Sequence, residues 1–221
     1  MSATILSIDT STENIVIAIS RDGEVLLDER HAAEQNHSRK LIKLIDDGLK
    51  KTTLKLTDVD AFACTTGPGS FTGLRTGLGT IKGFCYTLQK PLIGVPTLYA
   101  MAYPCIEYGT IATVLEAKKD FVYTAVFQYV NPEWVEKMPA QMMPVQNLPD
   151  QSQSVVYIGS ACKKYSSFFP GKAVFGNSKF DFICGKTLAD IAYRKYTLNE
   201  WEDVQSLEPL YVQKTAAEGY V

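Results

Sequence analysis

The first part of the chain alternates short apolar runs with polar turns. Residues 4–8 and 15–19 are rich in isoleucine and other apolar side chains, and this composition favours buried strands. The Asp22-Gly23 pair that follows is a typical hairpin turn, so it predicts that a third strand at residues 25–28 returns beside the second. We therefore expect the chain to begin with an antiparallel sheet.

Two longer segments, residues 37–50 and 71–88, repeat their apolar side chains with the period of an α-helix. Strand and helix patterns alternate after the first sheet, and the same order recurs after Pro104, which predicts an α/β fold of two related lobes. The predicted lobes are residues 1–103 and 104–221, and the last helix and tail could pack back on the first lobe. The remaining predicted strands are 61–66, 91–95, 110–115, 122–129, 155–158 and 173–175, and a further helix is predicted at 185–196.

Composition limits the classes of function. The chain has 221 residues, of which 46% are apolar, and its net charge is −2, so its overall charge does not favour nucleic acid or membrane surfaces. Five widely spaced cysteines indicate reduced thiols in a cytoplasmic protein and not a disulfide framework. We see no secretion signal at the start and no apolar run of the ~20 residues that a membrane-spanning helix needs. An RNA role would need a local basic patch or a partner that supplies the charge.

The glycine-rich segment T-T-G-P-G-S-F-T-G-L-R-T-G-L-G at residues 65–79 joins a predicted strand to a predicted helix. Backbone N–H groups of Gly67, Gly69 and Ser70 would lie at the N-terminus of that helix, where anions are favoured. The segment contains neither a Walker A pattern nor G-x-G-x-x-G. Phosphate binding and tight strand-to-helix packing both remain open.

The turn Asp9-Thr10-Ser11 follows the first predicted strand, and it is a second candidate for binding a nucleotide. A carboxylate with neighbouring hydroxyls can hold a metal–phosphate group, but the same residues also form ordinary polar turns. A metal–phosphate site would need a second carboxylate. The best candidate is Glu116, at the corresponding turn of the second lobe.

Both predicted helices carry more small or apolar surface than one core requires. At about 100° per residue, small residues alone form a stripe on helix 71–88, next to its leucine stripe. The apolar residues of helix 37–50 span an arc of about 160°, wider than one buried face. Either feature could reflect close packing within the chain or contact with a partner helix. The residues concerned are Gly73, Thr76, Gly77 and Thr80 on the later helix and His37, Leu41, Leu44 and Ile45 on the earlier one.

Histidine is nearly absent. His31 and His37 are six residues apart, so they do not share the i, i+4 spacing of a helical metal pair. We interpret them as surface or interface side chains and predict no metal site.

Four short motifs together carry a resemblance to a known family. They are I-D-T-S-T at 8–12, N-H-S-R-K-L at 36–41, G-P-G-S-F-T-G-L-R at 67–75 and P-L-Y-V at 209–212. In these motifs, in its length and in its predicted lobe order the chain resembles the bacterial TsaB (YeaZ) family. The resemblance covers essentially the whole chain, and the third motif is the most specific.

The resemblance implies an actin-like ATPase (ASKHA) fold with two RNase-H-like lobes. It also implies a non-catalytic scaffold in the transfer of threonylcarbamoyl to N6 of adenosine 37 in tRNAs that read ANN codons. The implied partners are the related transferase TsaD and the ATPase TsaE, with a homodimer possible through the same first two helices. ATP or ADP and metal would belong to the partner subunits, and tRNA would be met only through the complex. The predicted interface residues are His37, Leu41, Leu44, Ile45, Gly69, Gly73, Thr76, Gly77 and Thr80.

Several positions bear on this interpretation. Thr97 and Met101 stand where TsaD-like relatives carry a pair of histidine metal ligands, which argues against a metallopeptidase. The family's D-A-R turn reads Glu116-Ala117-Lys118 here, and Gln213 replaces a tail arginine. The rival interpretation is an active ATPase or kinase that uses Asp9, the 67–70 loop and Glu116.

Overall fold

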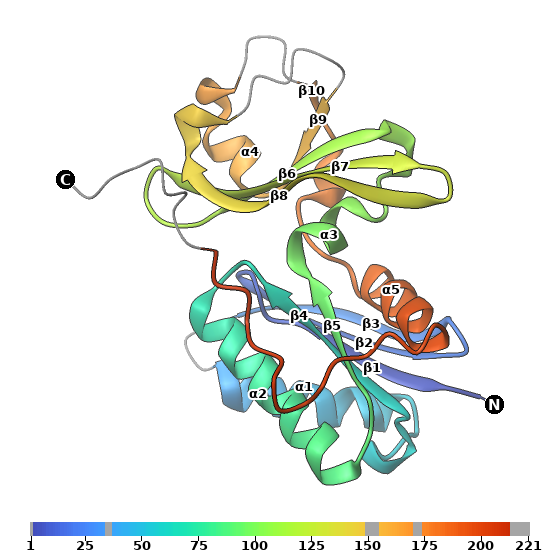
Figure 1. Ribbon diagram of the computed structural model, residues 1–221. Coiled ribbons are helices and arrows are strands. Elements are labelled where there is room, and N and C mark those ends of the chain that lie inside the picture. The colour runs from blue at the N-terminus through green and yellow to red at the C-terminus, as the bar shows by residue number, and fades with distance from the viewer. Residues whose placement is uncertain (1, 34–36, 149–154, 170–173, 213–221) are drawn as a thin grey trace. The chain divides into compact units, whose positions relative to one another are not determined.

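The computed structural model describes residues 2–33, 37–148, 155–169 and 174–212, and the backbone alone of residues 37–39 (Figure 1). The chain divides into two compact units. The first comprises Met1–Thr97 and Ile183–Leu210, and the second comprises Leu98–Phe182 and Tyr211–Val221. We describe each unit by itself.

The first unit is built on a five-stranded sheet with the strand order β3-β2-β1-β4-β5. The first three strands form the predicted antiparallel sheet, and β4 and β5 continue it in parallel with β1. The strands are β1 (Thr4–Asp9), β2 (Asn14–Arg21), β3 (Glu24–Ala32), β4 (Ala61–Gly67) and β5 (Leu92–Pro96).

Helices cover both faces of this sheet. Helices α1 (His37–Lys51) and α2 (Phe71–Leu88) contact each other, and their apolar side chains share one core cluster with Leu6, Ile8 and Ile17. Helix α5 (Gly185–Thr197) lies on the opposite face, against β1, β2 and β3. The predicted helices at 37–50, 71–88 and 185–196 agree with these bounds to within one residue.

The second unit repeats the topology of the first. Its sheet has the order β10-β9-β6-β7-β8, in which β6, β7 and β8 are antiparallel and β9 and β10 continue in parallel with β6. The predicted pair of related α/β lobes is therefore confirmed. The elements are α3 (Thr97–Ala102), β6 (Thr110–Glu116), β7 (Phe121–Val130), β8 (Glu133–Pro144), β9 (Val155–Ile158), α4 (Ala161–Lys164) and β10 (Val174–Phe175), and 3₁₀ turns occupy Leu56–Asp58, Ile106–Tyr108, Val145–Asn147, Ser166–Phe168 and Ser178–Phe180.

The C-terminal part of the chain returns to the first unit, which therefore combines Met1–Thr97 with Ile183–Leu210. The Asp28 carboxylate of β3 accepts hydrogen bonds from the backbone N–H groups of Gly185 and Lys186, each at 2.9 Å, and so caps α5. Leu188 and Ile191 of α5 are buried. The apolar face of α5 therefore completes the core of a sheet that began more than 150 residues earlier.

The segment after α5 runs along β5, the edge strand of the first sheet. The Glu202 backbone N–H donates to the Leu92 carbonyl at 2.8 Å, and the Glu202 carboxylate accepts the Gly94 N–H at 2.7 Å. The Lys195 ammonium donates to the Gly94 carbonyl at 2.9 Å and to the Glu202 carboxylate at 2.7 Å. Side chains thus satisfy backbone groups that an edge strand would otherwise leave unpaired.

Candidate functional site

The Asp9-Thr10-Ser11 turn lies at the carboxyl end of β1, and one oxygen of its carboxylate is engaged within the chain. One oxygen, Asp9 Oδ1, accepts from Ser11 N at 2.8 Å, Ser11 Oγ at 2.6 Å and Thr65 Oγ1 at 2.7 Å. Asp9 is 1% exposed, and Oδ2 has no hydrogen-bond partner among the described residues. Burial raises the pKa of the Asp9 carboxyl, against the opposing effect of these hydrogen bonds. This geometry is that of a buried polar turn.

The glycine loop packs directly on this turn. The Ser70 N–H donates to the Ser11 carbonyl at 2.7 Å, and the Ser70 hydroxyl accepts the Gly73 N–H at 3.2 Å as the N-cap of α2. A Cβ on Gly69 would lie 2.3 Å from the Ser11 carbonyl oxygen. One of the groups expected to meet a phosphate, the Ser70 N–H, is therefore engaged within the chain, and the loop shows the tight packing and capping that the sequence left open.

Gly67 faces the C-terminal segment of the first unit. Gly67 has φ +110°, and an added Cβ would lie 2.9 Å from the Leu210 carbonyl oxygen. The Leu210 N–H donates to the Thr66 carbonyl at 2.7 Å. The motif P-L-Y-V thus begins beside the glycine loop, although the two are about 140 residues apart in the sequence.

The small stripe of α2 leaves room for the chain itself. A Cβ on Gly73 would lie 1.9 Å from the Thr10 carbonyl oxygen, and one on Gly77 would lie 2.2 Å from Thr10 Oγ1. Thr10 Oγ1 donates to the Gly73 carbonyl at 2.8 Å. Thr76 and Thr80 are half-buried beside them. The interpretation that Gly73 and Gly77 are small for a partner helix is corrected, because Thr10 fills the space that they leave.

The predicted interface residues of α1 divide in the same way. Leu41 and Ile45 are 0% and 3% exposed and belong to the core, whereas Leu44 is half-buried. Ile42 of the same helix is 49% exposed. Gly69 is half-buried, and the side chain of His37 lies outside the described residues.

Another side of α2 is exposed, and the sequence analysis did not single it out. We call it the outer face of α2, and its members are Thr72, Arg75, Gly79, Gly83 and Tyr86. A Cβ added to Gly79 or Gly83 would meet nothing within 4 Å. Tyr86 is 67% exposed at the C-terminal end of this helix. The signal was present in the sequence, since positions 72, 79 and 83 fall within about 40° on the helical wheel.

The remaining candidate residues belong to other environments. Glu116 lies in the second unit at the end of β6, where its carboxylate pairs with the Lys164 ammonium at 2.5 Å. Thr97 and Met101 are buried. Within the described part of the chain, no three His, Cys, Asp or Glu side chains gather as metal ligands would. Gln213 lies outside the described residues.

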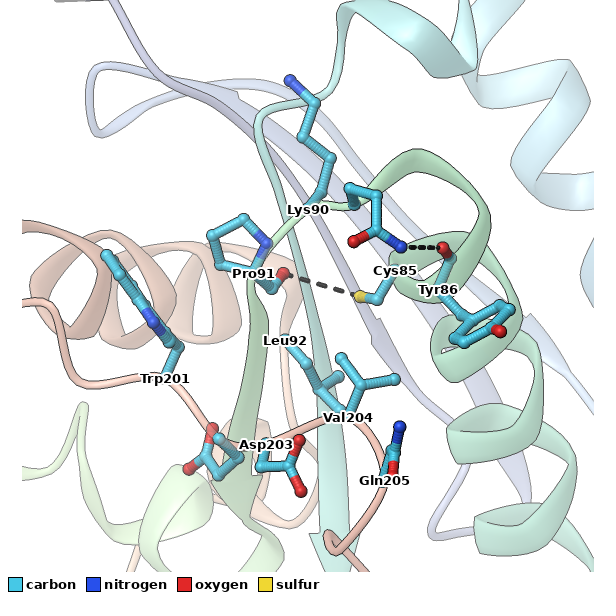
Figure 2. Close-up of a pocket in the computed structure, with 11 residues that line it drawn as sticks. Cys85, Tyr86, Lys90, Pro91, Leu92, Trp201, Asp203, Val204 and Gln205 are labelled. Atoms are coloured by element: carbon cyan, nitrogen blue, oxygen red, sulfur yellow. Dashed lines mark hydrogen bonds between the residues drawn. The ribbon is translucent and has the colours of Figure 1, made fainter.

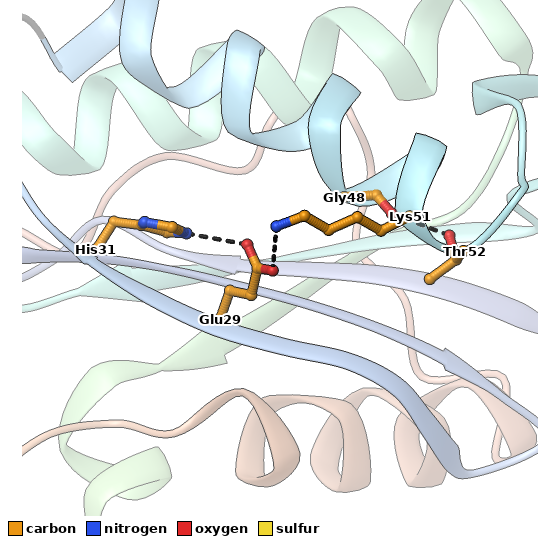
Figure 3. A network of polar contacts seen from close by, with 5 residues as sticks. All are labelled: Glu29, His31, Gly48, Lys51 and Thr52. Atoms are coloured by element: carbon orange, nitrogen blue, oxygen red, sulfur yellow. Dashed lines mark hydrogen bonds and ion pairs between the residues drawn. The ribbon is translucent and has the colours of Figure 1, made fainter.

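A polar network and a surface cavity lie elsewhere on the first unit. Glu29 of β3 pairs with His31 at 3.0 Å and with Lys51 of α1 at 2.6 Å, and so links the strand to the helix (Figure 3). An open cavity of about 600 Å³ lies between the end of α2, β5 and residues 201–205 (Figure 2). Cys85 lines it, and burial raises the pKa of this thiol to about 12, so the thiolate is not available near neutral pH.

No described helix is long and apolar enough to cross a bilayer.

The repeated sheet topology, with a polar turn and a glycine loop at the carboxyl ends of the first unit's parallel strands, defines a two-lobed α/β protein of the actin-like class. Residues 30–214 match the family model described as "TsaD: tRNA N6-adenosine threonylcarbamoyltransferase". The structure of YeaZ from Pseudomonas aeruginosa superposes with a TM-score of 0.82 at 24% identity, over 95% of this chain and 100% of that one.

Named relatives narrow the assignment. The Escherichia coli "tRNA threonylcarbamoyladenosine biosynthesis protein TsaB" is 35% identical over 127 residues, which are 56% of this chain and 54% of that protein. The Haemophilus influenzae protein of the same name is 28% identical over 225 residues, which cover 95% of this chain and 93% of that protein. The chain belongs to the TsaB (YeaZ) family.

Proposed function

We propose that this chain is a non-catalytic subunit of the assembly that makes N6-threonylcarbamoyladenosine at position 37 of tRNAs reading ANN codons. It acts in the cytoplasm by pairing with TsaD, and it helps to form the docking surface for TsaE. The single observation that carries the pairing is the exposed outer face of α2, on a chain whose family is that of the TsaB proteins.

The non-catalytic role is supported by how the candidate catalytic groups are used. The Asp9 carboxylate is buried and bonded to Ser11 and Thr65, and the Ser70 N–H is bonded to the Ser11 carbonyl. A nucleotide could reach these groups only by displacing contacts within the core of the first unit. In this proposal ATP or ADP and metal are bound by the partner subunits.

The pairing surface follows from the shape of the outer face of α2. Exposed glycines at 79 and 83 let another helix approach the backbone closely, much as small residues do at other helix–helix contacts. The exposed side chains of Phe71 and Tyr86, 53% and 67% exposed, stand at its two ends and supply aromatic anchors of the kind that dominate binding energy at interfaces. Ile42 of α1 adds an exposed aliphatic side chain. A homodimer through the same face would compete with TsaD.

The test is to co-express the chain with TsaD and TsaE from the same organism and to replace Gly79 by leucine. A Cβ at this position meets nothing within 4 Å, so folding should be retained, but a leucine obstructs a close helix and should abolish co-purification of TsaD. A matched control is Lys186→Leu, which adds the same side chain on the exposed side of α5. Co-purification of TsaD with the Gly79→Leu chain at the wild-type level would refute the pairing surface.

The role in tRNA modification needs a separate measurement. The wild-type gene should restore threonylcarbamoyladenosine, measured by mass spectrometry of tRNA nucleosides, to a cell depleted of its own TsaB. Absence of restoration together with a stable TsaD complex would contradict the functional proposal and leave the interface standing.

A further inference from the structure

Four lysines of the second unit lie close together at one end of its sheet. The tight turn between β6 and β7 carries Lys118 and Lys119, and Lys163 and Lys164 end helix α4. The ion pair between Lys164 and Glu116, at 2.5 Å, brings the two segments together. We call the turn 116–120 and residues 163–164 the basic end.

The charge here differs from the charge of the rest of the unit. The basic end contains four lysines and two acidic residues, whereas the other described residues of the second unit contain two lysines and four acidic residues. The unit has no arginine. Among the described residues of the unit, the lysines are thus concentrated at one place and the remainder is acidic, which gives the local patch that an RNA contact requires on a chain of net charge −2.

The individual ammonium groups differ in how they are held. Lys164 is paired with Glu116, and the Lys118 ammonium lies 4.7 Å from the centre of the Phe121 ring, so both side chains are held in place. Lys119 and Lys163 are exposed and make no ion pair with any described residue. Lysine is a compact, flexible point charge that suits phosphate oxygens without a fixed geometry.

We propose that the basic end contacts the phosphate backbone of tRNA, with Lys119 and Lys163 as the principal contacts. The inference rests on the proposed function, because that function brings tRNA to the complex, and it adds a direct RNA contact to a subunit expected to meet tRNA only through its partners. The exposed Phe168 ring, 50% exposed four residues after Lys164, offers a neighbouring surface for a base.

The test is a salt titration of tRNA binding by the assembled complex, with the double variant Lys119→Gln, Lys163→Gln. This variant keeps the Glu116–Lys164 pair, so the turn and helix stay in place. Each phosphate contact adds about one unit to the slope of log affinity against log salt, so the slope should fall by about two. By the same relation the affinity should fall by at least about tenfold near 0.1 M salt, with little difference near 1 M.

The control variant Lys137→Gln, Lys179→Gln removes the same charge from the other two described lysines of the unit and should bind tRNA within about twofold of wild type. Equal losses in both variants would mean that only net charge matters, and an unchanged slope in the first would mean that no contact exists; either result overturns the proposal. Failure of the first variant to assemble with TsaD would assign the basic end to protein docking instead.

The same titration on the chain alone separates this proposal from the proposed function. Lysine-dependent binding of the isolated chain supports the contact even if cells show no restored modification. If modification is restored but tRNA binding does not depend on Lys119 or Lys163, the proposed tRNA contact is refuted and the proposed function stands.

Discussion

Three glycines on one helix should respond to the same substitution in three different ways. Gly73, Gly77 and Gly79 of α2 each become alanine, a change that by itself favours an exposed helix by up to about 1 kcal/mol. The new methyl group would meet the backbone carbonyl of Thr10 at Gly73, the Thr10 side chain at Gly77 and open space at Gly79. Only the surroundings differ, so the three variants control for one another.

The expected magnitudes follow from these surroundings. Gly79→Ala should stabilise the protein by about 0.5–1 kcal/mol. For a chain of this size, each kcal/mol raises the melting temperature by roughly 2–4 °C. Gly77→Ala places Cβ 2.2 Å from Thr10 Oγ1, so the turn or helix must move by about 1 Å. Overpacking of that kind costs about 1–3 kcal/mol, and loss of the hydrogen bond from Thr10 to Gly73 adds about 1 kcal/mol. Gly73→Ala should be the most damaging, because a carbonyl 1.9 Å away cannot rotate aside.

A second substitution distinguishes a side-chain clash from a backbone clash. Thr10→Ala removes the Oγ1 atom that Gly77→Ala would meet and leaves the Thr10 Cβ at 3.3 Å. The double variant Thr10→Ala, Gly77→Ala should therefore be more stable than the sum of the single effects predicts, by about 1–2 kcal/mol. The same partner substitution should give no such gain with Gly73→Ala.

The measurement is the free energy of unfolding from urea titration followed by circular dichroism, with the slope against urea compared between variants. Stabilisation by Gly77→Ala, or destabilisation by Gly79→Ala of more than about 1 kcal/mol, would refute the assignment of the inner and outer faces of α2. Additive effects of Thr10→Ala and Gly77→Ala would refute their contact. A general weakness of the helix would instead shift all three glycine variants in the same direction.

Three further substitutions test the buried turn, the polar network and the covered sheet edge. Burial raises the pKa of Asp9, so ionisation of this carboxyl is disfavoured in the folded state. The free energy of unfolding should therefore fall as the pH rises from the unfolded pKa of about 4 toward the folded pKa. Across that range, urea titrations should show the stability of Asp9→Asn increasing relative to that of the wild type. The hydrogen bond from Lys51 lowers the pKa of Glu29, so this contact should stabilise the folded state above about pH 4.3. The stabilisation should be lost as the pH falls through the folded pKa. Glu29→Gln should therefore be less stable than the wild type near neutral pH and equally stable in acid. Glu202→Gln should speed hydrogen exchange of the Gly94 amide by about tenfold, measured by NMR, and an unchanged rate would contradict the role of this carboxylate at the sheet edge.

Much of the fold could be predicted from local patterns. The strands at 4–8, 15–19 and 61–66 and the helix at 71–88 were predictable, because buried β-branched runs and helical periodicity are local signals. Strand β8 was not. Its 12 residues contain Pro139 at an irregular register with β7, and they form an edge with little burial, so neither alternation nor composition marked it.

The candidate site was less predictable, because its contacts join distant parts of the chain. The sequence showed that Gly73 and Gly77 share a side of α2, but not that Thr10, more than 60 residues earlier, fills the space beside them. Leu41 and Ile45 illustrate the same limit, since a wide apolar arc does not say which part is core. The spacing of Gly79 and Gly83 indicated a second side of α2 with small residues. It could be recognised as exposed only once the side facing the sheet was known.

The cap that Asp28 provides to α5 has a consequence for synthesis on the ribosome. The two bonded residues are 157 positions apart. At about 5–20 residues per second, the sheet face under α5 therefore stays uncovered for roughly 8–30 s after Asp28 is made. The main segment of the second unit, Leu98–Phe182, is translated entirely within that interval and can fold before the first unit is complete. A nascent chain interrupted before Ile183 would expose the apolar side of β1 and β2 to chaperones and proteases, so quality control has a long window in which to act on this protein.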